Sequence, residues 1–136
     1  MTISVIILFT PIVAYIVAGS IKFFLNSYHK KTLAFSHIGM GGFPSTHNTI
    51  TSATASVIGF ELGFLTTEFL ICFMILIIIA IDSVDLRQKI SEHAKLINQL
   101  DKNKSVLRTS IGHSKFEMLG GLFLGFLVGL ILSNFS

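Results

Sequence analysis

The sequence predicts an all-α integral membrane protein, a helical bundle of about four transmembrane helices plus one amphipathic cytoplasmic helix. Three observations predict this class. The 136-residue chain is 51% hydrophobic and only 12% charged, whereas soluble domains carry about 25% charged residues. Its apolar residues gather in runs that approach the roughly 20 residues a membrane span requires. One polar stretch repeats its apolar residues at helical spacing. At this length we expect a single domain covering residues 1–136.

Composition also excludes several classes. The apolar content excludes disorder, two prolines exclude a collagen-like repeat, and the single Cys72 excludes a disulfide scaffold. The net charge of +3 could suggest nucleic acid, but 13 phenylalanines lie within aliphatic runs, so a lipid bilayer is the better partner. We therefore expect no nucleic-acid partner.

Three apolar runs are the clearest spans. Residues 2–25 form the first, with Pro11 as a tolerable kink, and no basic segment precedes it as a signal peptide would require. Residues 69–81 are almost purely aliphatic, and residues 118–132 form the last run. Glycines at 121, 125 and 129 recur every four residues, so they line one helix face and allow close helix packing.

The segment 47–64 is rich in serine and threonine. It would be a poor lipid-facing span but a reasonable helix buried among the other three. Between residues 81 and 114 the apolar residues fall near helical spacing, which predicts an amphipathic surface helix; they are Leu86, Ile90, Leu96, Ile97 and Leu100. A short polar turn is expected at residues 101–105.

Charge predicts the orientation. With four spans, residues 22–46 and 82–115 lie on one side of the bilayer, and both termini and residues 62–68 lie on the other. All 10 basic residues fall on the first side, which the positive-inside rule makes cytoplasmic. We therefore expect a multi-pass protein of the cell inner (plasma) membrane, with both termini outside.

Two histidine-containing stretches are candidates for a functional site. Residues 41–47, GGFPSTH, form a tight loop at a helix start, where backbone N–H groups, Ser45 and Thr46 suit an anion and His47 can carry a proton. The plain alternative is a helix cap made by Ser45 or Thr46. In the second stretch, Glu117 lies four residues after His113 on one helix face, where its carboxylate can orient the imidazole. The plain alternative there is an interfacial pair without chemistry.

Three cations, Lys22, Arg87 and Arg108, could each simply snorkel to lipid headgroups. The four-span topology, however, places all three beside both histidines at one membrane face. Two histidines and three cations suit a phosphate dianion, with one histidine to attack and the other to protonate the leaving oxygen. No metal-ligand pattern appears in the sequence, and we expect no metal and no cofactor.

These motifs resemble the type 2 phosphatidic acid phosphatase superfamily, and most closely its divergent bacterial and plastid branch. The superfamily pattern P-S-G-H is matched by PSTH at 44–47, with Thr46 in place of glycine. The branch patterns G-G-M-P-S-S-H-S, D-x-x-G-V-R, I-N-x-L and G-H-x-P-x-E are similar to this chain in order; the matching residues are GGFPSTHN at 41–48, DSVDLR at 82–87, INQL at 97–100 and GHSKFE at 112–117.

The resemblance implies a role for each matched residue. His113 would be the nucleophile that forms a phosphohistidine, Glu117 its orienting carboxylate, and His47 the acid. Lys22, Arg87 and Arg108 would bind the phosphate with Ser45 and Thr46, while Asp82 would give structural support by holding Arg87.

The resulting expectation is a metal-independent membrane lipid phosphatase that acts on a phosphomonoester or diphosphate of the phosphatidylglycerophosphate or phosphatidate type, with its active site facing the cytoplasm. Alternatives are a polyprenyl diphosphate phosphatase and a non-catalytic membrane lipid-binding subunit with a vestigial phosphate site; a small transporter is a weaker option. The glycine-faced last helix and the short chain are compatible with a homodimer.

Overall fold

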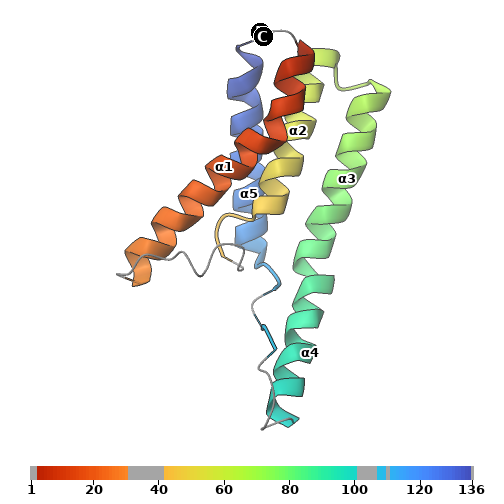
Figure 1. Ribbon diagram of the computed structural model, residues 1–136. Helices are drawn as coiled ribbons and strands as arrows, with labels where there is room; N and C mark the ends of the chain where they lie inside the picture. The colour runs from red at the N-terminus through yellow and green to blue at the C-terminus, as the bar shows by residue number, and fades with distance from the viewer. Residues whose placement is uncertain (1–2, 31–41, 101–106, 110, 136) are drawn as a thin grey trace.

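The fold is entirely helical, as expected. The computed structural model describes residues 3–30, 42–100, 107–109 and 111–135. The predicted turn at 101–105, Gly41 and several of the basic residues lie outside these ranges. Within them the chain forms five α-helices (Figure 1), namely α1 (Ile3–Lys30), α2 (Thr46–Leu62), α3 (Thr67–Val84), α4 (Leu86–Leu100) and α5 (Lys115–Ser133).

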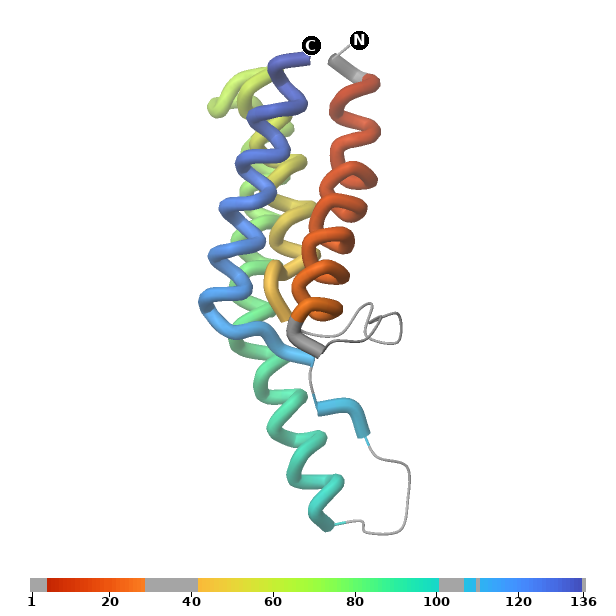
Figure 2. Tube along the Cα trace, turned by 90° about the vertical axis from the view of Figure 1, so that its left-hand side faces the viewer, coloured from red at the N-terminus to blue at the C-terminus, as the bar shows by residue number. Residues whose placement is uncertain are grey.

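Helix α2 is the centre of the bundle. It packs against α1, α3 and α5, and α1 begins at the same end of the bundle at which α5 ends (Figure 2). An even number of crossings would give this arrangement. The described part of the chain holds three helices long and apolar enough to cross a membrane, Val5–Tyr28, Thr67–Leu100 and Lys115–Ser133. These correspond to the three predicted apolar runs, and α2 is the buried helix among them.

The serine and threonine side chains of α2 have partners inside the bundle. Thr54 Oγ1 donates to the carbonyl of Ile50 at 2.9 Å, a bond within one turn. Ser52 Oγ donates to the carbonyl of Leu122 on α5 at 2.7 Å. These two hydroxyls are therefore satisfied by protein and need no water.

The glycine stripe of α5 packs on α2. A Cβ atom at Gly121 would lie 2.5 Å from the carbonyl oxygen of Ser45, and one at Gly129 would lie 2.6 Å from Ser56 Cβ. At Gly125 it would overlap the carbonyl oxygen of Thr49. The predicted close helix contact is therefore present, but it lies within one chain. The stripe is not free to join two copies, which removes one of the two reasons that the sequence offered for a homodimer.

Helix α4 is present where the sequence predicts it, but its direction differs from that of a helix lying on the bundle. It continues the line of α3 past the ends of the other helices (Figure 1). The hydrogen bonds from Asp85 N to Ile81 O and from Lys89 N to Asp85 O, both 3.0 Å, carry the helical pattern through the joint. At 1.5 Å per residue, 34 residues span about 51 Å, well beyond a hydrocarbon core of about 30 Å.

The apolar residues of α4 point away from the protein. The five predicted ones, Leu86, Ile90, Leu96, Ile97 and Leu100, are all exposed, whereas Ser91 and Ala94 are buried. Ser91 Oγ accepts hydrogen bonds from Ile111 N and Gly112 N, each at 3.1 Å. The small polar face of α4 thus holds the segment that leads to His113.

Candidate active site

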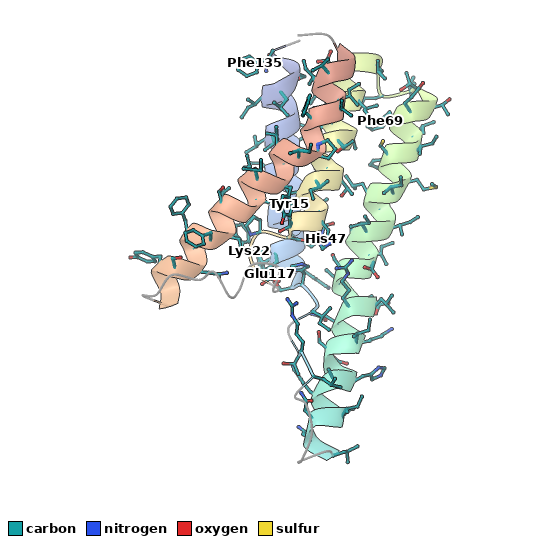
Figure 3. The ribbon with its side chains drawn as sticks, in the orientation of Figure 1. Tyr15, Lys22, His47, Phe69, Glu117 and Phe135 are labelled. Atoms are coloured by element: carbon teal, nitrogen blue, oxygen red, sulfur yellow. The ribbon has the colours of Figure 1, made fainter. Side chains whose placement is uncertain are left out.

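Most of the predicted site residues lie at one end of the bundle, where α2 begins, α3 ends and α5 begins. Figure 3 shows Lys22 of α1, His47 of α2 and Glu117 of α5 in this region. Lys22 and His113 are buried, with 6% and 5% of their surface exposed, and His47 is exposed. Four separate segments of sequence therefore supply one cluster.

His113 is fixed by both its backbone and its ring. Its N–H donates to the carbonyl of Ser83 on α3 at 3.0 Å, and Nδ1 lies 3.1 Å from Glu117 Oε2. An ionised carboxylate can only accept, so Nδ1 carries the proton and Nε2 keeps a free lone pair. The spacing-based prediction of this pair agrees with the structure, and the geometry leaves Nε2 as a nucleophile or base.

Glu117 has a second task. Its Oε2 also accepts from the backbone N–H of Ser114 at 2.9 Å, while Ser114 Oγ accepts from Glu117 N, so the two residues form the capping box of α5. The carboxylate that orients the imidazole is therefore held by the helix start itself.

Burial is the main influence on His113. Desolvation lowers its pKa from the usual 6.5, the hydrogen bond and charge of Glu117 raise it, and the positive charges of Lys22 and Arg87 lower it. The net direction is downward, so the imidazole is neutral at neutral pH.

Two of the predicted cations influence both histidines. The charges of Lys22 and Arg87 act on His113 and on His47, and the two imidazoles act on each other. Arg87 Nε forms an ion pair with Asp82 Oδ2 at 2.6 Å, the contact that the family resemblance led us to anticipate. Asp82 thereby orients the guanidinium at the junction of α3 and α4.

Ser45 occupies the N-cap position of α2, but its side chain makes no capping bond. Its hydroxyl accepts from Asn48 Nδ2 at 2.8 Å, and its backbone N–H donates to the carbonyl of Glu117 at 3.0 Å. The simple helix-cap interpretation of Ser45 is therefore wrong: its side chain is engaged with Asn48 instead. Thr46 is the half-buried first residue of α2.

Arg108 is exposed and lies in the short segment 107–109, before His113. Leu107 is joined to Asn98 of α4 by two hydrogen bonds of 2.8 and 2.7 Å, which hold the exposed Arg108 beside that projecting helix.

Sequence reasoning missed two polar residues. Asn48 is completely buried, and Nδ2 donates to Ser83 Oγ on α3 at 3.1 Å as well as to Ser45. Ser83 is 1% exposed, and its carbonyl receives the N–H of His113. Their only signal in the sequence is position, since Asn48 follows His47 and Ser83 follows Asp82.

The fold and the cluster define a class, that of helical proteins with apolar helices able to cross a membrane and a histidine–carboxylate pair among basic residues at one end of the bundle. The chain belongs to the Divergent PAP2 family, whose match covers residues 3–128 and so includes every predicted site residue. No curated protein and no solved structure shows significant similarity to it. The resemblance drawn from the motifs is confirmed at the level of the family.

Proposed function

We propose that this protein is a membrane lipid phosphatase that works through a phosphohistidine on His113 and needs no metal ion. One observation carries the proposal: a buried, neutral imidazole whose Nδ1 is held by Glu117 lies within reach of the charges of Lys22 and Arg87. Family membership supports the same chemistry.

In the first step, Nε2 of His113 attacks phosphorus and the bond from phosphorus to the lipid oxygen breaks. His47 gives its proton to that oxygen, which leaves as an alcohol. Lys22 and the terminal NH₂ groups of Arg87 offset the charge on the phosphoryl oxygens, since Asp82 engages only Nε of that guanidinium. Glu117 stabilises the positive charge that the imidazole gains.

In the second step, water attacks the phosphorus, gives a proton to His47 and breaks the bond to Nε2. Inorganic phosphate leaves and His113 returns to its neutral form. The same two histidines therefore serve both halves of the reaction, with His47 as acid in the first step and base in the second, and His113 as nucleophile and then leaving group.

Apolar surface beside the site supports a lipid as substrate. Phe116, three residues after His113, is 84% exposed, and Phe43, before the α2 start, is 48% exposed. Exposed apolar side chains can mark a surface that contacts a membrane or an apolar ligand. An alkyl chain can lie along them while its phosphate reaches His113.

We further propose that α1, α2, α3 and α5 all cross the bilayer. The site end of the bundle carries Lys22, Arg87 and Lys115, while Glu61 and Glu68 lie at the junction of α2 and α3 at the other end. The positive-inside rule then places the site at the cytoplasmic face, which favours phosphatidylglycerophosphate or phosphatidate over a diphosphate presented outside.

The test is phosphate release by the purified protein from these two lipids and from a polyprenyl diphosphate, with EDTA present. We expect release from the first two, inhibition by vanadate, and loss of at least about 10³-fold in His113→Ala. Full activity of that variant would exclude His113 as nucleophile. Absence of release from every substrate by the wild-type protein would favour the non-catalytic lipid-binding alternative.

A further inference from the structure

Five residues of the site close a ring of hydrogen bonds across three helices. Asn48 Nδ2 joins Ser45 Oγ to Ser83 Oγ, Ser83 O receives His113 N, His113 Nδ1 pairs with Glu117, and Glu117 O receives Ser45 N. Each link measures between 2.8 and 3.1 Å. In this ring Asn48 is the member that joins α2 to α3.

The assignment of the Asn48 amide follows from its partners. Ser83 Oγ donates its own proton to Ala80 O at 2.8 Å, so it can only accept from Asn48. The NH₂ group of Asn48 must therefore point at the two serines, which directs Oδ1 elsewhere. Among the described residues, Oδ1 is buried without a hydrogen-bond partner.

Asn48 keeps this unpaired oxygen although it is unfavourable for folding. A buried acceptor without a donor opposes folding, and one in a native structure calls for an explanation. A residue selected for packing alone would be apolar here, because Asn48 is completely enclosed. The two N–H donors of the amide are the feature that an apolar residue lacks.

The place of Asn48 in the chain indicates what those donors do. It follows His47 directly, and its bond to Ser83 ties this first turn of α2 to the residue that holds the backbone of His113. We propose that Asn48 is a positioning residue that fixes the spacing between the acid His47 and the nucleophile His113. This inference rests on the proposed function, because the proposed function assigns the roles of acid to His47 and nucleophile to His113.

The experiment compares Asn48→Ala and Ser83→Ala with Ser52→Ala. Ser52→Ala is the matched control, because it also removes a buried interhelical hydrogen bond of α2 but lies outside the ring. We expect Asn48→Ala and Ser83→Ala each to lower kcat about 10- to 100-fold with KM within about threefold. The double variant should lose no more than the worse single one, since both break the same link. Ser52→Ala should keep kcat within about twofold.

Thermal unfolding in detergent separates positioning from folding. The Tm of Asn48→Ala should be no more than a few degrees below that of Ser52→Ala, because the Asn48 substitution removes the unpaired oxygen together with the hydrogen bonds. Equal kcat in Asn48→Ala and Ser52→Ala would overturn the proposal, and so would a fall in kcat that only accompanies a large loss of Tm.

Vanadate binding, measured by calorimetry, tests the positioning role of Asn48 separately from the proposed phosphatase activity. If the wild-type protein releases no phosphate but binds vanadate, the phosphatase assignment fails. The positioning role is still supported if Asn48→Ala then binds vanadate tenfold more weakly than Ser52→Ala. Unchanged binding by Asn48→Ala, or no binding by the wild type, overturns it.

Discussion

At the scale of single residues, Glu117 serves the helix and the imidazole with one carboxylate oxygen. Its Oε2 accepts from Ser114 N and pairs with His113 Nδ1. Glutamine at this position can still complete a capping box but carries no charge. Glu117→Gln therefore separates the two tasks.

We expect Glu117→Gln to change the acid limb of the pH profile of kcat/KM. In the wild type, burial lowers the pKa of His113 below 6.5, so kcat/KM is retained as pH falls through 6.5 and is lost only as pH passes the lowered pKa. Because Glu117 raises that pKa, its removal moves the limb to still lower pH. We also expect kcat to fall about 10- to 100-fold, the usual cost of losing an orienting partner.

Ser114→Ala is the matched control. It breaks the capping box, which costs about 1 kcal/mol, but leaves the His113–Glu117 pair intact. Its pH profile should match that of the wild type. An unchanged profile and kcat in Glu117→Gln would contradict the orienting role.

At the scale of helices, the contact of α5 with α2 depends on the absence of side chains. A Cβ at Gly125 would overlap the Thr49 carbonyl oxygen, and its next neighbour would be Ser52 Cβ at 2.6 Å. Gly125→Ala must therefore push two helices apart. We expect the free energy of unfolding to fall by about 1–3 kcal/mol, the usual cost of overpacking, read as a lower Tm in detergent.

Gly19→Ala in α1 is the control, because nothing lies within 4 Å of its added Cβ. Alanine there should leave the free energy of unfolding unchanged or raise it by up to about 1 kcal/mol, since glycine is the poorer helix former. Equal Tm values for the two variants would show that α2 and α5 are not in this close contact.

At the scale of the whole molecule, the position of α2 decides the topology. If α2 crosses the bilayer, Tyr28 near the end of α1, which is 84% exposed, and Leu65 in the turn after α2, which is 94% exposed, lie on opposite sides. If it does not cross, both lie on the same side.

Single cysteines in a Cys72→Ser background test this in intact cells with a membrane-impermeant maleimide. Leu65→Cys should be labelled from outside, and Tyr28→Cys only after the membrane is opened. Labelling of both from the same side would contradict the four-span arrangement.

Different parts of the site were predictable to different degrees. His113 and Glu117 are four residues apart, so local spacing suffices to pair them. The pairing of Asp82 with Arg87 was expected from the family resemblance instead. Asn48 and Ser83 are separated by 35 residues, and nothing in either segment indicates the other.

By itself, the sequence determined the helical class, the three long apolar helices, the glycine face of α5 and the histidine–carboxylate pair. All of these follow from composition or from spacing within one helix. Only the tertiary structure decided that the glycine face meets α2, that α4 continues α3 beyond the bundle, and that Asn48 links the two histidine segments. The physical reason is that periodicity defines the faces of a helix, while packing against the other helices selects which face each one meets.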